Sequence, residues 1–200
     1  MQSRWDKQAV KGKDKLDLLV YRSRLIGQEP PLCVWGGGNT STKGEVRDLH
    51  GRWRQVVWVK GSGSDLKASE RRDFPMLFLD EVLPALKHRT MTDEEMVDFL
   101  SRCMADPSSP RPSIETLLHA FVPEPDIDHT HADAVLSLTN TAQSRRLCYS
   151  VFGKELLWIP YLKPGFTLAK QMAEAYMKYP SAKGALLENH GLITWGRSAY

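Results

Sequence analysis

The segment Asp126-Ile-Asp-His-Thr-His-Ala-Asp133 holds the residues whose types and spacing best suit chemistry. Within it, His129 and His131 are two residues apart. Side chains alternate between the two faces of an extended segment, so both imidazoles are predicted to point the same way, with Thr130 on the other face. Two imidazoles on one side of a strand form half of a metal site.

A third histidine, His190, lies much later in the chain, at the end of a predicted strand over residues 184–190. Catalytic zinc sites commonly use three protein ligands and keep the fourth position open. Asp128 and Asp133 flank the histidine pair and are candidates to fix the histidine tautomers. The spacing is equally compatible with structural histidines that only form hydrogen bonds, so both interpretations stay open at this point.

Glu115 is the candidate proton shuttle beside such a metal. It lies in the first turn of a predicted helix over residues 113–121, which follows a proline-rich loop and has Ser113 as its N-cap. Glu115 and His119 are four residues apart and share a helix face. The two side chains are interpreted either as a local surface pair or as part of the metal site.

Two glycine-rich loops are candidates for binding an anion. Gly36-Gly-Gly-Asn-Thr-Ser-Thr42 follows a predicted short strand over residues 32–35, and Lys60-Gly-Ser-Gly-Ser-Asp-Leu66, with a lysine at its mouth, ends the predicted strand 53–60. Glycines let backbone amides converge on an anion, and asparagine and hydroxyl side chains add donors. Neither loop has Rossmann or P-loop spacing, and each alone also fits a surface turn. The helix N-terminus at Ser113 is a third anion candidate.

Composition and charge narrow the class of protein. The 200 residues fit one domain of roughly 100–200 residues. The net charge is +3 and no block of lysine and arginine is long enough for a nucleic-acid arm, so no nucleic-acid partner is expected. The three cysteines, Cys33, Cys103 and Cys148, form no CxxC motif, which argues against disulfides and suits the cytoplasm. No apolar run reaches ~18 residues, so neither a membrane span nor a signal peptide is expected.

Hydrophobic periodicity predicts alternating helices and strands. Helices are predicted over residues 13–27, 73–88, 93–104, 113–121, 132–141 and 165–179. Strands are predicted over residues 32–35, 53–60, 156–159, 184–190 and 192–195, with a hairpin over 46–60 and a plain connection over 142–155. This alternation favours a sheet with helices on its faces. Because the chain stops just after its last predicted strand, we expect it to be part of a longer polypeptide.

Five short motifs, in this order, resemble the class II aldolase/adducin family. They are Gly38-Asn39-Thr40-Ser41, Gly61-Ser62-Gly63, Pro112-Ser113-Ile114-Glu115, His129-Thr130-His131 and Glu188-Asn189-His190-Gly191. The residues of these motifs are most similar to those of the aldolase half of bifunctional rhamnulose-1-phosphate aldolase/dehydrogenases. The resemblance implies one domain over residues 1–200, followed by a dehydrogenase domain or a closing helix. It also implies a three-layer α/β/α fold around a mainly antiparallel or mixed sheet.

The resemblance assigns roles to individual residues. It implies that one Zn²⁺ per subunit binds His129, His131 and His190, and that Glu115 is the acid/base, which also touches the metal when substrate is absent. The residues that lie where the family holds phosphate are Asn39, Ser62, Gly63 and Ser113. The family often has a second serine after the first in this last motif, and Ile114 stands there instead. This departure removes one phosphate donor and puts the identity of the anion in question.

The resemblance also implies a reaction and an assembly. The reaction is retro-aldol cleavage of a ketose 1-phosphate, such as rhamnulose 1-phosphate, to dihydroxyacetone phosphate and lactaldehyde. In some family members a tyrosine from a neighbouring subunit protonates the leaving aldehyde; Tyr149 is the candidate here and Tyr161 a second. A homotetramer is expected. The alternatives are another sugar-phosphate aldolase, a 4-epimerase, a non-catalytic adducin-like domain or a structural metal module.

Overall fold

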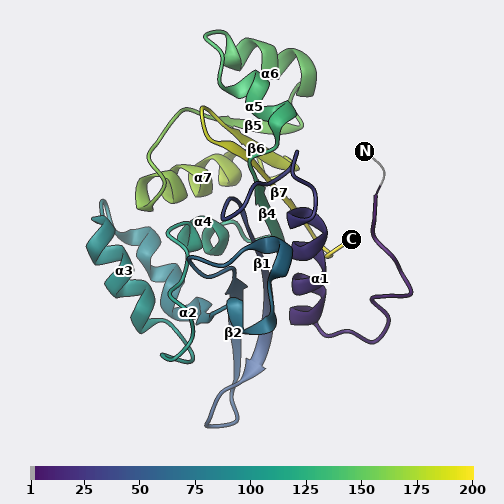
Figure 1. Cartoon of the computed structure of the whole chain (residues 1–200). Helices are drawn as coiled ribbons and strands as arrows, with labels where there is room; N and C mark the ends of the chain where they lie inside the picture. The colour runs from purple at the N-terminus through teal and green to yellow at the C-terminus, as the bar shows by residue number, and fades with distance from the viewer. Residues whose placement is uncertain (1–2) are drawn as a thin grey trace.

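The computed structural model describes residues 3–200, in which one seven-stranded sheet runs through the middle of the molecule (Figure 1). The strands are β1 (Asn39–Arg47), β2 (Trp53–Val59), β3 (Met76–Phe78), β4 (Asp126–Thr130), β5 (Leu156–Ile159), β6 (Gly184–Leu187) and β7 (Gly191–Gly196). Their order across the sheet is β3-β2-β1-β4-β7-β6-β5. Only the β5–β6 pair is parallel, so the expectation of a mainly antiparallel, mixed sheet is confirmed.

Helices cover both faces of this sheet. The α-helices are α1 (Lys15–Gly27), α2 (Leu79–Val82), α3 (Asp93–Arg102), α4 (Thr116–Phe121), α5 (Asp133–Thr139), α6 (Ser144–Phe152) and α7 (Phe166–Lys178). Short 3-10 helices span Leu66–Ala68, Arg71–Asp73 and Leu83–Lys87. The main core lies between the sheet and α2, α3, α4 and α7, while α1, α5 and α6 pack through two smaller clusters. The three-layer α/β/α architecture predicted from the motifs is therefore confirmed.

The helices of the main layer form where the sequence gives them an apolar side and a start signal. Helix α7 buries Phe166, Ala169 and Met172 at helical spacing against the core. Helix α3 begins with a capping box, in which the Thr92 and Glu95 side chains each accept a bond from the other's backbone amide. Both helices agree with their predicted spans to within a few residues.

The pairing of β4 with its two neighbours decides which residues meet at the C-terminal end of this strand. This central strand lies between β1 and β7, and Asn39 of β1 is directly opposite His129. On the other side, Thr130 pairs with Leu192 of β7. Strand β4 therefore ends beside the start of β1 and beside the turn that leads into β7, and that turn carries His190.

Two predicted elements are wrong. Residues 32–35 form no strand but a turn before β1, where Val34 and Trp35 are exposed and have no strand beside them to pair with. Residues 73–88 form no continuous helix. Met76–Phe78 instead pair with β2 at the sheet edge, before α2 and a 3-10 turn that contains Pro84. The apolar spacing fitted a helix, but pairing of the backbone with β2 decided the structure.

Two further differences concern helix limits. The helix predicted from Ser113 starts only at Thr116, because the Ser113 hydroxyl accepts the amide of Glu115 in a turn before the helix. The predicted connection over 142–155 contains helix α6. That helix buries only Ser144 and Cys148 and begins without a side-chain N-cap, so it lacks the start signal that marks α3.

Candidate active site

Three histidines meet at the end of β4. One nitrogen from each of His129, His131 and His190 lies within 4.8 Å of the others. His129 is on β4, His131 follows its last residue, and His190 lies in the turn between β6 and β7. The prediction that His129 and His131 point the same way is confirmed, because their Nε2 atoms are 3.0 Å apart.

The hydrogen bonding of His129 fixes its tautomer. Its Nδ1 is 3.0 Å from the Leu192 carbonyl oxygen, which only accepts, so Nδ1 carries the proton and donates it. Burial lowers the pKa of His129 to about 4, so the ring is neutral at pH 7 and its Nε2 presents a lone pair. That lone pair faces His131 and Glu115, which is the orientation a shared cation requires.

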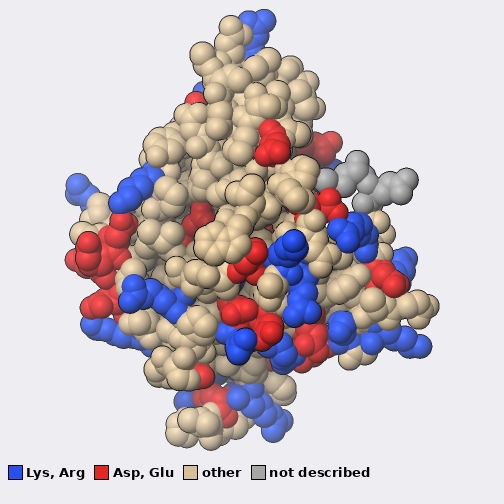
Figure 2. All heavy atoms as spheres, in the orientation of Figure 1, with Lys and Arg blue, Asp and Glu red and all other residues tan. Residues whose placement is uncertain are grey.

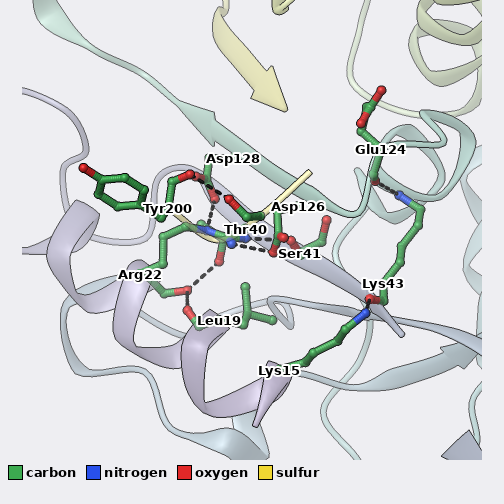
Figure 3. Close-up of polar contacts among 12 residues, drawn as sticks. Lys15, Leu19, Arg22, Thr40, Ser41, Lys43, Glu124, Asp126, Asp128 and Tyr200 are labelled. Atoms are coloured by element: carbon green, nitrogen blue, oxygen red, sulfur yellow. Dashed lines mark hydrogen bonds and ion pairs between the residues drawn. The ribbon is translucent and has the colours of Figure 1, made fainter. Parts of the chain in front are cut away.

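Asp128 does not fix a histidine tautomer, contrary to expectation. Its side chain lies on the opposite face of β4, where it accepts a 2.8 Å bond from Arg22 Nε (Figure 3). Side chains alternate along a strand, so a residue next to His129 cannot share its face. Asp133 lies in the first turn of α5 and is exposed. The orienting group of His129 is a backbone carbonyl, which the residue types in the sequence do not reveal.

Glu115 approaches the histidines from the other side of the cluster. Its Oε1 is 3.4 Å from His190 Nε2 and 3.6 Å from His129 Nε2. This Oε1 and the Nδ1 of His190 are buried and have no hydrogen-bond partner among residues 3–200. Unpaired buried polar atoms are costly, so the Oε1 of Glu115, which faces the histidines, indicates a missing partner at the cluster.

A divalent metal fits this set of atoms. Three imidazoles and one carboxylate oxygen are ligand types that zinc prefers. Burial lowers the pKa of His190 to about 4 and lowers the pKa of His131, so all three rings are neutral and available as ligands at pH 7. His129, His131 and His190 would hold the ion, with Glu115 beside it.

A chain of hydrogen bonds orients the Glu115 carboxylate. Asn39 Nδ2 donates to Glu115 Oε2 at 2.5 Å, and Asn39 Oδ1 accepts from His119 Nε2. The other nitrogen of that ring, Nδ1, lies 2.8 Å from the Ser41 hydroxyl, which therefore donates to it. His119 is fully buried, so the surface pair with Glu115 is wrong; it is not one of the three clustered histidines, but it belongs to the site through Asn39.

His119 is therefore a member of the site that lies outside the five motifs, and Ser41, which ends the first motif, acts through it. The spacing of Glu115 and His119 did place them on one helix face, but the two side chains meet only through Asn39. Asn39 is reached because the antiparallel register sets it directly opposite His129. That long-range pairing is not visible in local sequence.

Gly191 is required by close packing at the metal cluster. A Cβ atom built there would lie 2.5 Å from the Thr130 carbonyl oxygen and 3.1 Å from His129 Cε1. Any side chain at this position would displace β4 or the histidine ring. The glycine that follows His190 therefore keeps the turn pressed against the histidine pair.

The structure brings the predicted anion segments together. Asn39 Nδ2 is 3.5 Å from the Ser113 hydroxyl. The Ser62 amide donates to the Arg111 carbonyl at 2.9 Å, and Gly61 pairs with Pro112, so the 61–63 loop lies beside the segment that leads to Ser113. Gly63 is exposed and has a φ of 84°, which favours glycine.

The two candidate tyrosines lie elsewhere in this chain. Tyr149 is on α6, which extends beyond the sheet in Figure 1, and 60% of it is exposed. Tyr161 is also exposed, and its backbone amide donates to Glu188. Among residues 3–200, neither hydroxyl forms a hydrogen bond with the histidines or with Glu115.

The surface and the helices agree with the composition. Figure 2 shows lysines and arginines intermixed with aspartates and glutamates over one face of the molecule, rather than a continuous basic stripe. Within residues 3–200, the longest and most apolar helices still fall short of what a bilayer crossing needs.

Comparison with known proteins identifies the family. Residues 18–200 match the family described as Class II Aldolase and Adducin N-terminal domain. The chain belongs to this family. The uncharacterized oxidoreductase YuxG of Bacillus subtilis is 47% identical over 196 residues, which are 98% of this chain and 28% of that protein. This chain therefore spans little more than a quarter of the length of that relative.

Solved structures share the fold. The N-terminal class II aldolase domain of a conserved Thermoplasma acidophilum protein is 45% identical, with a TM-score of 0.91, covering 100% of this chain and 91% of that one. L-fuculose-1-phosphate aldolase from Thermus thermophilus is 16% identical, with a TM-score of 0.53, covering 90% of this chain and 80% of that one. A sugar-phosphate aldolase from Thermotoga maritima is 13% identical, with a TM-score of 0.65, covering 92% and 84%. The last two likenesses concern the fold alone.

Proposed function

We propose that this class II aldolase domain is a zinc-dependent sugar-phosphate aldolase that cleaves a ketose 1-phosphate by a retro-aldol reaction. The observation that carries the proposal is the buried, unpartnered Oε1 of Glu115 facing His129 and His190, with the candidate anion segments at Asn39 and Ser113 beside it. The sugar-phosphate and L-fuculose-1-phosphate aldolases that share this fold support the class of reaction.

The chain's own residues divide the work of the reaction. When bound, the metal supplies positive charge that polarises the ketose carbonyl and stabilises the negative charge formed during cleavage. Asn39, the Ser62 hydroxyl, the Gly63 amide and Ser113 hold the phosphate group and fix the position of the sugar. The hydroxyl group beside the breaking C–C bond loses its proton to a base, the bond breaks and the aldehyde leaves. The carboxyl group of Glu115 then protonates the carbon of the remaining dihydroxyacetone phosphate fragment, and the proton lost by the hydroxyl group restores that carboxyl group.

Asn39 and His119 position Glu115 for that proton transfer. The amide of Asn39 binds Oε2 and leaves Oε1 directed at the histidine cluster. His119, held by Ser41, in turn fixes the Asn39 amide. A carboxylate held at one oxygen presents the other in a single orientation, which favours transfer to one carbon atom.

We further propose the substrate and the assembly. The substrate is of the rhamnulose 1-phosphate type and the aldehyde product is lactaldehyde. The support is the resemblance of the five sequence motifs to rhamnulose-1-phosphate aldolases. The domain acts in a cytoplasmic homotetramer, where the exposed Tyr149 reaches the site of a neighbouring subunit and takes up the proton of the hydroxyl group that becomes the aldehyde, the reverse of protonating the aldehyde in the synthetic direction. Residues 1–200 form one domain of a longer protein that also carries a dehydrogenase.

The alternatives use the same site or dispense with it. A 4-epimerase would cleave and rejoin the same bond, and another aldolase would take another sugar phosphate. A non-catalytic adducin-like domain would have no use for three converging imidazoles and an unpaired carboxylate. Metal content separates that last alternative from the enzymes, and product analysis separates aldolase from epimerase.

The proposal is tested by incubating the zinc-loaded full-length protein with rhamnulose 1-phosphate. We expect dihydroxyacetone phosphate to form and the reaction to stop when a chelator removes the metal. An epimeric ketose phosphate as the only product would make the protein an epimerase. No reaction with several sugar phosphates, despite confirmed metal content, would contradict the proposed function.

A further inference from the structure

His190 differs from His129 in how the chain holds its ring. The Nδ1 of His129 donates to the Leu192 carbonyl at 3.0 Å, and His129 itself lies on a strand that is paired on both sides. The Nδ1 of His190 is buried and has no hydrogen-bond partner among residues 3–200, and its Nε2 lies 3.4 Å from Glu115 Oε1 at the cluster. The position of the His190 ring therefore depends on the turn that carries it.

That turn is tight and holds an unfavourable backbone conformation. The amide of His190 donates to the Leu187 carbonyl at 3.1 Å, which closes the turn between β6 and β7. Within it, Asn189 has a φ of 52°, in the left-handed region that side chains disfavour. The amide of Asn189 reaches the Thr139 carbonyl only at 3.3 Å, a long hydrogen bond. Such a turn keeps one shape only when neighbouring contacts hold it.

Glu188 supplies the contacts that hold the turn. Its Oε1 accepts from the Ser144 hydroxyl at 3.2 Å, and its Oε2 accepts from the Tyr161 amide at 3.0 Å. Its own backbone amide donates to the Ile159 carbonyl at 3.0 Å. The residue is thus joined to the start of α6, to the end of β5 and to the segment that follows β5. Three parts of the chain fix the residue that stands two positions before His190.

The contact with α6 favours both partners. Ser144 is buried and is the first residue of α6, and this helix has no side-chain N-cap of its own. A carboxylate at a helix N-terminus interacts favourably with the helix dipole and with the unpaired donors there. Glu188 is half-buried, so solvent screens this interaction only in part. The carboxylate therefore prefers one position beside α6, and the turn shares it.

We propose that Glu188 is a positioning residue for the metal, because it holds the turn in the place where His190 joins His129 and His131. The inference deepens the proposed function, since it names the residue that sets one ligand of the same metal site. Glu188 acts through the backbone of residues 188–190 and needs no contact with the ion. Because α6 also carries Tyr149, the same carboxylate connects that helix to the metal ligand.

The test compares Co²⁺ binding by the metal-free full-length wild type and its variants, measured by competition with a chelator and by visible absorption. Glu188→Ala should weaken Co²⁺ binding by about 10- to 100-fold, the range for mutating a group that orients a metal ligand, and should alter the absorption of the bound ion. Glu174→Ala, which changes an exposed glutamate of α7, should match the wild type in both.

Glu188→Gln tests whether the two hydrogen bonds do the positioning. The glutamine carbonyl can accept from the Tyr161 amide and its NH₂ group can donate to the Ser144 hydroxyl, so Co²⁺ binding should return to nearly the wild-type value. If Glu188→Ala does not fold, Ser144→Ala replaces it and should weaken Co²⁺ binding about two- to tenfold, the equivalent of one hydrogen bond.

A purely structural Glu188 predicts a different result. Glu188→Ala would then unfold at a lower urea concentration, but the folded variant would bind Co²⁺ with the affinity and absorption of the wild type. That result, failure of Glu188→Gln to restore binding, or absence of Co²⁺ binding by the wild type would overturn the inference. Weaker binding by Glu188→Ala, together with no aldol cleavage by the zinc-loaded wild type, would uphold the positioning role and contradict only the proposed reaction.

Discussion

The two faces of strand β4 are both polar and largely buried, but they balance their charges differently. On the α1 face, Arg22 donates to Asp126 at 2.6 Å, to Asp128 at 2.8 Å and to the Ser41 carbonyl at 2.7 Å (Figure 3). On the other face, His129 lies against two more imidazoles and a carboxylate oxygen that has no hydrogen bond. On the first face the chain's own residues pair the buried charges. On the second face a buried oxygen atom lacks a partner that a ligand would supply.

The difference separates structural from functional polar groups. A buried charge whose partners all belong to the chain stabilises one arrangement of helix and strand. A buried polar atom left unpaired costs free energy, which a bound ion or substrate recovers.

The largest effect is expected from His131→Ala. Removing one of three metal ligands should lower zinc affinity by more than about 100-fold and abolish cleavage. This loss exceeds the loss caused by mutating a residue that only hydrogen-bonds to a metal ligand. His50→Ala, which changes an exposed histidine in the β1–β2 turn, should leave both unchanged. Metal analysis after dialysis measures the result. Stoichiometric zinc in His131→Ala would remove this residue from the ligand set.

The next effect concerns the proton transfer by Glu115. Glu115→Gln should keep its zinc but slow exchange of the C–H proton of dihydroxyacetone phosphate by about 10²- to 10⁴-fold, the usual contribution of a general acid or base. Glu155→Gln, an exposed glutamate paired with Lys183, is the control. Nuclear magnetic resonance in deuterium oxide follows the exchange. An unchanged rate would show that another group moves the proton.

On the α1 face, the expected effect is on folding. Arg22→Met leaves Asp126 and Asp128 without their cation and should lower the free energy of unfolding by about 3 kcal/mol, the lower end for a broken buried ion pair because both carboxylates are partly exposed. Urea denaturation of the metal-free protein measures it. His131→Ala should change the stability of the metal-free protein by less than about 1 kcal/mol. Equal losses in the two variants would erase the contrast between the faces.

The smallest effect is a pH dependence set by His119. Burial lowers the pKa of His119 well below its usual 6.5, while the unfolded chain takes up a proton near that value. The unfolded state therefore binds more protons below pH 6.5, and stability is full above this pH and falls as the pH decreases.

His119→Gln isolates this contribution in the metal-free protein. The stability of the wild type should fall between pH 6.5 and 5 with up to about 1.4 kcal/mol per pH unit from His119 alone. The variant should show a slope smaller by that amount, although its stability at pH 7 is lower because a hydrogen bond is lost. Identical slopes in urea titrations would mean that His119 is protonated in the folded state.

The sequence contained the residue types of the site but not their mutual positions. His129 and His131 were predictable because alternation in a strand is a local rule. His190 and Glu115 were candidates from their places at a predicted strand end and in the first turn of a predicted helix, and the resemblance to the family assigned their roles. The connections through Asn39, His119 and Ser41 depend on β1 pairing with β4 across more than eighty residues of chain. The contact of Asp128 with Arg22 of α1 is likewise a long-range contact. No local pattern encodes such a register.

The fold shows the same division between local and long-range determinants. Helices α3 and α7 have a capping box or a clear apolar stripe and were found. Helix α6 has few buried residues and was missed, and Met76–Phe78 was assigned to a helix because its apolar spacing was correct for one. Pairing with β2 outweighed that spacing, which is a tertiary effect.

The most direct test of the account is a titration of the metal-free protein with Co²⁺, followed by visible absorption. The histidine cluster on the face of β4 that carries His129 predicts that one equivalent of Co²⁺ binds per chain. The bound Co²⁺ should show the visible absorption of a nitrogen-rich, low-coordinate site. This absorption should disappear when Zn²⁺ displaces Co²⁺, and it should be absent in His131→Ala. Absence of stoichiometric Co²⁺ binding, or an unchanged spectrum in His131→Ala, would contradict the claim that the three histidines and Glu115 form a metal centre.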